Sequence, residues 1–225
     1  MRQHVKHLLI GFDHHFGNSR TDGLKEYQAY GKALGIEVTQ AKPFWFAEAL
    51  NGKKITVAPE ISKCSVTEPD KVTVSSSLIR RLLLAGNIEE ANVALGHPYS
   101  LTGTVVGGHH IGTSIGYPTA NIEPLFTGKL VPAIGVYAVW VNEEGHWYKG
   151  MLNIGRRPTL QVDSTIVIEV HLLDFTGNLY GKVLTLKFMK RLRKEIHFPD
   201  VEALVAQMHA DKSQVETYLQ QPLIS

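Results

Sequence analysis

The 225-residue sequence predicts an α+β protein made of two different parts. Three observations support this fold class. The N-terminal part has a strand–helix–strand pattern, which is typical of parallel strands joined by a crossover helix. From Ser100 onward, runs rich in β-branched residues follow one another at short spacing, as in an antiparallel barrel or sandwich. The C-terminal residues return to an apolar pattern of helical period.

The first part begins with an apolar strand at residues 8–12, followed by a helical pattern over residues 24–34. Gly35 is a typical residue to end this helix, and a second strand is predicted at residues 36–39. A parallel sheet normally has several strands and is covered on both faces. We therefore expect this part to be only a fraction of such a sheet.

Two short helices are predicted before the β part. Ser75 offers an N-cap oxygen to the first helix, and Asn87 with Glu90 resembles a capping box at the start of the second. A His-Pro pair then interrupts the helical pattern. We place the domain boundary there, which gives domains of residues 1–97 and 98–225.

The β part is predicted to contain five strands, joined by connections rich in glycine, proline and asparagine. They are expected at residues 101–106, 135–141, 147–154, 165–173 and 183–189. Apolar residues with a period of 3.6 then predict a helix between residues 198 and 219.

Composition and charge exclude several function classes. The 23 Lys and Arg residues nearly balance the 21 Asp and Glu residues, so the basic surface that a nucleic-acid polymer requires is not expected. The early apolar run is too short for a membrane span or a signal sequence. The single cysteine, Cys64, favours a reducing compartment. We expect a cytoplasmic protein without nucleic-acid or membrane partners.

Glycines and a Pro-Thr-Ala-Asn sequence are concentrated in residues 103–121. Closely spaced glycines let backbone N–H groups approach a phosphate, although a glycine-rich hairpin explains them equally well. After Pro118, Thr119 and Asn121 project to the same side if the segment is extended. Their oxygens suit Mg²⁺ and phosphate, while the alternative is that both side chains cap a turn.

Glu169 is the only acid within an otherwise apolar predicted strand. With a period of two, it shares one face with Val167 and His171, and the apolar residues take the other face. A carboxylate in such a strand could accept a proton from a hydroxyl group, but a salt bridge at the rim is an equal alternative. His171 is interpreted as a structural histidine.

Five motifs in this order and spacing resemble the riboflavin kinase family over residues 98–219. They are Gly103-x-Val105 with Gly112 and Gly116-Tyr117-Pro118-Thr119-Ala120-Asn121; Asn153-Ile154-Gly155-Arg156-Arg157-Pro158-Thr159; Glu169-Val170-His171; Leu179-Tyr180-Gly181; and Arg193-x-Glu195-x-x-Phe198. Upstream, residues 11–17 and 75–80 resemble the end of the FMN adenylyltransferase (FAD synthetase) module. That module precedes the kinase in bacterial bifunctional enzymes.

The resemblance implies a six-stranded Greek-key barrel with a C-terminal helix, preceded by a partial Rossmann-like nucleotidyltransferase segment. It implies an ATP-dependent kinase that converts riboflavin to FMN with Mg²⁺. Thr119 and Asn121 would hold Mg²⁺ and phosphate, and Glu169 would orient or deprotonate the terminal ribityl hydroxyl. The implied nucleotide- and flavin-binding residues are Gly103, Gly107, Gly112, Gly116 and Pro118 in a loop over the ATP phosphates. Arg193 and the Asn153–Thr159 turn, with Asn153 and Gly155 as binding residues, would belong to mobile loops that close on flavin and nucleotide.

The sequence departs from the bifunctional enzymes at one motif. Adenylyltransferases of this type have a His-x-Gly-His signature, and none occurs in these 225 residues. We therefore expect the chain as given not to form FAD. Two alternatives remain: a longer native chain with both activities, and a barrel that binds flavin or nucleotide without chemistry. Arg193 can also be interpreted as a solvated charge within a run of basic residues.

Overall fold

The structure is a computed structural model that describes residues 5–11, 23–45, 73–108, 112, 115–157 and 165–220. The chain divides into two compact units, and the second begins at Ser75 among the described residues. Predicted features within residues 12–22, 46–72 and 158–164, Cys64 among them, lie outside the described residues.

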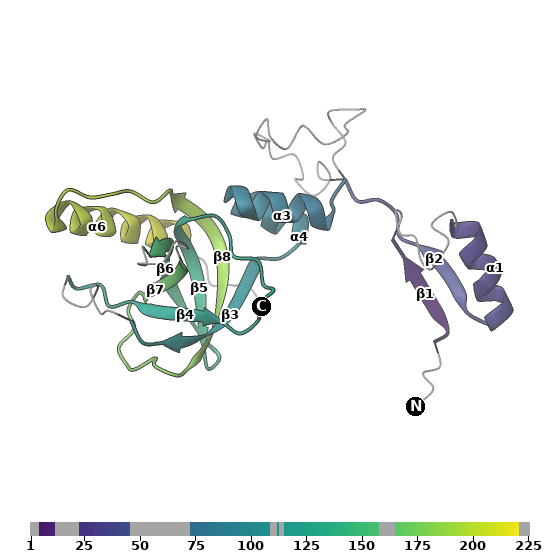
Figure 1. Cartoon of the computed structure of the whole chain (residues 1–225), viewed down its shortest axis with the longest axis horizontal. Helices are drawn as coiled ribbons and strands as arrows, with labels where there is room; N and C mark the ends of the chain where they lie inside the picture. Colours follow the sequence, from purple (N-terminus) through teal and green to yellow (C-terminus); the bar gives the residue numbers. More distant parts are fainter. Residues whose placement is uncertain are drawn as a thin grey trace. The chain divides into compact units, whose positions relative to one another are not determined.

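The first unit contains the predicted strand–helix–strand pattern. Strands β1 (His7–Ile10) and β2 (Glu37–Gln40) pair in parallel, and α1 (Leu24–Leu34) lies between them in the sequence. Ile10, Val38 and Tyr27 are buried together in this unit, which is purple in Figure 1. Gly35 ends α1 with a φ of 70°, a left-handed conformation that glycine adopts without strain. The predicted helix end is confirmed.

The second unit begins with the helix pair α3 (Ser76–Ala85) and α4 (Ile88–Leu95). The Ser75 hydroxyl accepts a hydrogen bond from the Leu78 amide at 3.2 Å, so the predicted N-cap is confirmed. The capping box at Asn87 is wrong, because its side chain makes no capping bond. The Asn87 amide instead donates to the Leu82 carbonyl at 2.9 Å. This residue therefore closes α3 and does not take the extended N-cap conformation.

Hydrogen bonds attach the helix pair to the barrel that follows. The Asn92 side chain donates to the Phe188 carbonyl at 2.8 Å and accepts from the Tyr99 amide at 2.7 Å. Arg191 donates to the carbonyl of Ala85, at the end of α3. The change between the compact units therefore falls at Ser75, upstream of the domain boundary that we predict after residue 97.

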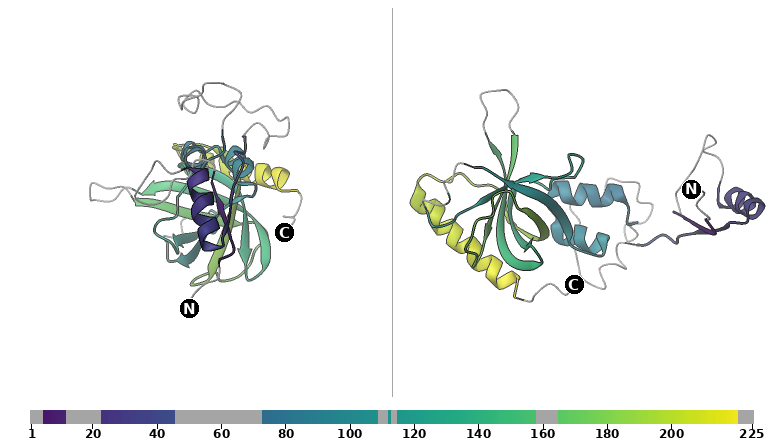
Figure 2. Two further views of the ribbon diagram at one scale, coloured as in Figure 1. Left: turned by 90° about the vertical axis from the view of Figure 1, so that its right-hand side faces the viewer. Right: turned by 90° about the horizontal axis from the view of Figure 1, so that it is seen from below.

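Six antiparallel strands close into a barrel in the order β3-β4-β7-β6-β5-β8 (Figures 1 and 2). The strands are β3 (Tyr99–Val106), β4 (Ala120–Pro124), β5 (Gly135–Glu143), β6 (His146–Arg157), β7 (Thr165–Leu172) and β8 (Val183–Arg193). Of the two predicted architectures, barrel and sandwich, the structure contains the barrel. It also adds β4, which the sequence pattern does not reveal because this strand is short and follows Pro118.

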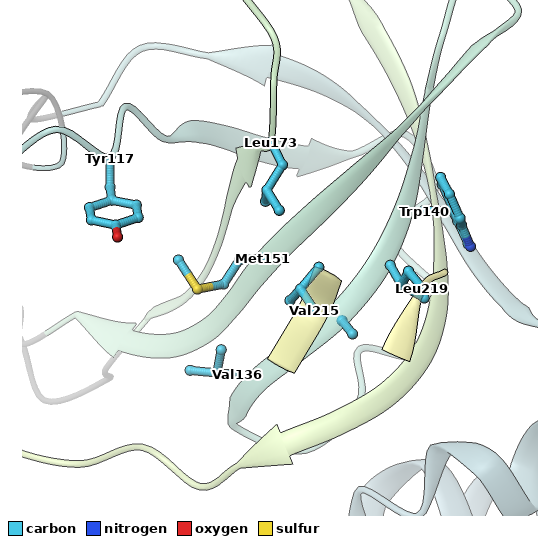
Figure 3. Close-up of a cluster of buried hydrophobic side chains, with 8 residues drawn as sticks. Tyr117, Val136, Trp140, Met151, Leu173, Val215 and Leu219 are labelled. Atoms are coloured by element: carbon cyan, nitrogen blue, oxygen red, sulfur yellow. The ribbon is translucent and has the colours of Figure 1, made fainter. Parts of the chain in front are cut away.

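Alternation along the strands separates the barrel interior from its outer face. Residues with less than 6% exposure fill the interior, among them Leu101, Val105, Tyr137, Leu152, Ile168, Val170 and Leu186. On the outer face, α6 (Val201–Tyr218) packs against β5 and β6. Figure 3 shows part of this contact, in which Val215 of α6 lies near Val136 and Met151, and Leu219, the residue after the helix, lies on the side of Trp140.

The N-cap of α6 is Asp200, whose carboxylate accepts a hydrogen bond from the Ala203 amide at 2.7 Å. The predicted C-terminal helix is thus confirmed. In the part of the chain that the structure describes, neither α6 nor any other helix combines the length and apolar character needed to cross a membrane.

Candidate active site

A pocket of about 450 Å³ lies on the outer face of the barrel. Its walls come from the segment before β4, from β4, β5, β6, β7 and β8, from the connection that follows β8, and from α6. The lining includes seven of the predicted site residues, which are Gly112, Thr119, Asn121, Asn153, Gly155, Glu169 and Arg193. The structure therefore brings together residues from all of the predicted motifs except Leu179-Tyr180-Gly181.

One row of directly opposed residues crosses the strands that line this pocket. Asn121 of β4 pairs with Glu169 of β7, and Glu169 pairs with Asn153 of β6. Asn153 pairs with Val136 of β5, and Val136 pairs with Arg193 of β8. Opposed residues in antiparallel strands have side chains on the same face, with Cβ atoms about 4.5–5.5 Å apart. The pairing thus gathers a carboxylate, two carboxamides and a guanidinium.

Glu169 occupies the middle of this row. Its neighbours along β7 on the same face, Val167 and His171, also line the pocket, while Ile168 and Val170 point into the barrel and are buried. The predicted division of this strand into two faces is therefore confirmed. Asn121, beside Glu169, is only 9% exposed, so the carboxylate lies at the edge of a partly desolvated surface.

Two histidines hold the segment that carries Thr119. His171 of β7 donates from Nδ1 to the Pro118 carbonyl at 2.8 Å, which agrees with its predicted structural role. The Tyr117 hydroxyl lies 2.8 Å from Nδ1 of His209 in α6, and the Tyr117 ring makes edge contacts with both imidazoles. Tyr117 is 5% exposed. These contacts anchor the residues before β4 and direct Thr119 toward the pocket.

The glycines of the predicted phosphate loop have different positions. Gly112 lines the pocket, and a Cβ on it would lie 2.1 Å from the Tyr117 carbonyl oxygen. Gly103 lies within β3, where a Cβ would lie 2.5 Å from the Ile122 side chain, so this glycine serves packing within the barrel wall. The other predicted loop residues, Gly107, Gly116 and Pro118, are not among the described residues that line the pocket.

Gly108 has a closer relation to the site than sequence analysis indicates. A Cβ on Gly108 would lie 1.9 Å from Nδ2 of Asn121 and 2.8 Å from its Cγ. The backbone therefore passes directly against the Asn121 carboxamide, and only glycine permits that approach.

The prediction that Arg193, Asn153 and Gly155 lie in mobile loops is wrong. Asn153 and Gly155 belong to β6, which pairs with β7 through the whole segment from Gly150 to Arg157. Arg193 is the last residue of β8. A register shift in the β5–β8 pairing sets Arg193, rather than its predecessor, opposite Val136. Such a bulge re-aims side chains, and here it brings Arg193 to the pocket.

Arg193 is also not a solvated charge, because its guanidinium pairs with Asp211 of α6. Nε lies 2.9 Å and 3.1 Å from the two carboxylate oxygens, and Nη2 lies 2.8 Å from Oδ2. Sequence analysis misses Asp211. The sequence does contain a signal for it. Asp211 is followed at intervals of four by the buried residues Val215 and Leu219, so an acidic residue occupies a position where the helical pattern predicts an apolar one.

Further pocket residues were not predicted as site residues. They are Ile115, Val136, Met151, Arg156, Val167, His171, Glu195, Ile196, Phe198, Leu204, Met208 and Asp211. Eight of the twelve are apolar, and six of these come from α6, from the connection before it and from the strands β5 and β6 that it covers. Arg156, His171, Glu195 and Phe198 lie in the motifs that carry the family resemblance. A sequence pattern cannot distinguish the remaining apolar residues from ordinary core.

Comparisons with known proteins place this geometry in a family. A riboflavin kinase (flavokinase) family model matches residues 95–219. The chain is 36% identical over 216 residues to the bifunctional riboflavin kinase/FMN adenylyltransferase of Bacillus subtilis, covering 95% of this chain and 60% of that protein. It is 34% identical over 216 residues to the protein of the same name from Listeria monocytogenes, covering 96% and 60%.

One solved structure resembles the chain over most of its length. The crystal structure of a macrolide-efflux protein from Streptococcus pneumoniae has a TM-score of 0.74 and 30% identity, and the match covers 93% of this chain and 60% of that one. The chain thus spans about 60% of the length of the curated relatives described above. Because the family model covers more than half of the residues, including the barrel, the pocket and α6, the chain belongs to the riboflavin kinase family.

Proposed function

We propose that this chain transfers the γ-phosphate of ATP to the 5′-hydroxyl of riboflavin, giving FMN and ADP. The observation that carries the proposal is the position of Glu169, between Asn121 and Asn153 in the row of opposed residues and in the same pocket as Thr119. Family membership supports the substrates, and the pocket supplies groups suited to each of them.

The pocket has a polar side and an apolar side. Thr119, Asn121 and the backbone at Gly112 form the polar side, which suits the phosphates of ATP. The connection after β8 and helix α6 contribute mainly apolar side chains, namely Ile196, Phe198, Leu204 and Met208. Such side chains suit a flat aromatic ring system. We assign the isoalloxazine ring to this side, so that the ribityl chain extends toward Glu169.

Glu169 then acts on the ribityl 5′-hydroxyl. Its carboxylate accepts the hydroxyl proton in a hydrogen bond, orients the oxygen toward the γ-phosphate and takes up the proton as the O–P bond forms. The phosphoryl group leaves ADP as the bond to the β-phosphate oxygen breaks. Phosphoryl transfer depends chiefly on such positioning and on charge stabilisation.

The polar side also fits a magnesium ion. The Thr119 hydroxyl and the Asn121 carboxamide are hard oxygen donors of the kind that Mg²⁺ prefers, and both line the pocket. When bound, Mg²⁺ would neutralise charge on the phosphate oxygens. Thr119 and Asn121 orient the phosphate chain toward Glu169.

The experiment incubates the chain with riboflavin and MgATP and separates the flavins by chromatography. We expect FMN and ADP in equal amounts and no FAD, since the sequence lacks the His-x-Gly-His signature. Glu169→Gln is expected to lower turnover about 10²–10⁴-fold, the contribution of a positioned proton acceptor. Glu123→Gln is the matched control, because Glu123 is an exposed acid of β4 that does not line the pocket.

Each outcome decides between alternatives. If the chain binds riboflavin and never yields FMN, it is a binding module and the proposed function is wrong. If FMN forms equally well with Glu169→Gln, the kinase assignment holds and the role of Glu169 is wrong. FAD in the product would contradict the expected absence of adenylyltransferase activity.

A further inference from the structure

A buried ion pair borders the proposed flavin side of the pocket. Asp211 of α6 has 0% exposure, and both of its carboxylate oxygens lie within 3.1 Å of Nε of Arg193. The Arg193 side chain keeps 17% exposure and lines the pocket. The anion is therefore almost fully removed from solvent. Asp211 also borders the pocket, but Arg193 is the more exposed member of the pair and the one with hydrogen-bond donors to offer a ligand.

Further contacts fix this pair in one geometry. Gln207, one turn before Asp211 on α6, donates from Nε2 to Oδ1 of Asp211 at 2.8 Å. Nη1 of Arg193 donates to the Lys194 carbonyl at 3.1 Å, and the guanidinium carbon lies 5.7 Å from the centre of the Phe198 ring. The guanidinium is thus held from three directions. Because it has five N–H groups, donors remain for acceptor atoms in the pocket.

Fold stability is a weak reason for burying such a pair. A buried ion pair contributes little net stability relative to apolar residues of the same volume, since desolvation offsets the attraction. Besides Gln207, the helix places the apolar residues Val215 and Met208 within a turn of Asp211, so an apolar side chain could pack at this position. Arg193 lies opposite Val136 of the pocket wall, after two register shifts in the β5–β8 pairing.

We propose that Asp211, supported by Gln207, is a positioning residue that holds the Arg193 guanidinium where it donates to acceptor atoms on the edge of the flavin ring. This inference rests on the proposed function, because it assigns the flavin to the α6 side of the pocket. Asp211 borders the same pocket but has no exposed surface, and it acts through Arg193. Its effect should therefore be confined to the flavin and should not extend to the nucleotide.

The test is Asp211→Asn, which keeps the shape of the side chain and removes its charge. We expect KM for riboflavin to rise about 10- to 100-fold, the loss typical of a charge-assisted hydrogen bond, with KM for ATP within about twofold of the wild type. A titration that follows riboflavin fluorescence should show the same rise in the dissociation constant. This titration needs no turnover, so it separates failure of the inference from failure of the proposed kinase activity.

Asp200→Ala is the control on the same helix. Asp200 caps α6 and is exposed, so its loss weakens the helix without touching the pocket. We expect Asp200→Ala to lower the unfolding temperature and to leave KM for riboflavin within about twofold. Gln207→Leu, which removes one bond to Asp211, should raise KM for riboflavin in the same direction by about threefold. If the Asp211→Asn variant does not fold, the KM of the Gln207→Leu variant for riboflavin tests the inference instead.

A double mutant tests whether Asp211 works through Arg193. If it does, Arg193→Gln combined with Asp211→Asn should bind riboflavin no more weakly than Arg193→Gln alone. The inference is overturned if the two losses add. It is also overturned if Asp211→Asn changes riboflavin and ATP parameters equally, or leaves riboflavin binding unchanged and lowers only the unfolding temperature.

Discussion

Replacing Gly108 with alanine tests whether the Asn121 carboxamide must occupy its observed position. The added methyl carbon would lie 1.9 Å from Nδ2 of Asn121. The carboxamide must then move by more than an ångström before the contact becomes tolerable. Asn121 is fixed in β4 by pairing with Val106 on one side and Glu169 on the other, so the side chain must rotate while its backbone stays in place.

A displacement of about an ångström in a group that positions a reacting centre can cost about 10²-fold in rate. We therefore expect Gly108→Ala to lower kcat/KM for ATP about 100-fold, which corresponds to roughly 2.7 kcal/mol of transition-state stabilisation. KM for riboflavin should change much less, because the flavin side of the pocket is untouched. The assay is the initial rate of FMN formation with each substrate varied in turn.

Gly107→Ala is the matched control one residue away. A Cβ on Gly107 would meet its nearest neighbour, an atom of the Tyr180 ring, at an ordinary 3.8 Å. We expect this variant to keep kcat/KM within about twofold of the wild type, since nothing in the site must move. If Gly108→Ala and Gly107→Ala have the same kcat/KM for ATP, the position of the Asn121 carboxamide does not affect the reaction. The proposed role of Asn121 in orienting the phosphates is then wrong.

Two further predictions concern stability. Burial raises the pKa of Tyr137 from 10.0 to about 12, so the unfolded chain loses this proton at a lower pH than the folded protein. Its stabilising contribution, about 2–3 kcal/mol, should be present below pH 10 and lost as the pH rises from 10 to 12. Urea unfolding between pH 9 and 12 should show this slope, and Tyr137→Phe should flatten it; equal slopes would contradict the assignment. Asn92→Ala should destabilise the second unit by about 1–3 kcal/mol in urea, because it breaks the bonds to Phe188 and Tyr99. The control is Asn178→Ala, which removes an exposed hydrogen bond from the Tyr180 amide. A similar loss of unfolding free energy in both variants would contradict the role of Asn92 in attaching the helix pair to the barrel.

Local features of this fold could be predicted from the sequence because their causes are local. Gly35 and Ser75 mark helix ends through their own backbone and side-chain chemistry. The alternation around Glu169 follows from the geometry of one strand, and it correctly separates the pocket face from the barrel interior. For such features, neighbouring residues contain the whole physical cause.

Features that depend on pairing between distant segments could not be predicted. Strand β4 is short and exists because β3 and β7 flank it, so its own residues give little signal. The partner of Arg193 across β5 depends on two register shifts in the β5–β8 pairing, and either shift alone would have placed a different residue opposite Val136. Motif resemblance did bring Thr119, Asn121 and Glu169 together as site candidates, and the structure unites them in one pocket. Their roles in catalysis stay predictions.

The order of strands around the barrel has a consequence for protein synthesis. Of the strands that the structure describes, β8 is the last that a ribosome makes, yet it lies between β3 and β5 and completes the ring. A nascent chain can therefore expose Asn121 and Glu169 before the wall that contains Arg193 exists. Helix α6 emerges later still. The pocket is therefore complete only after both β8 and α6 have been made.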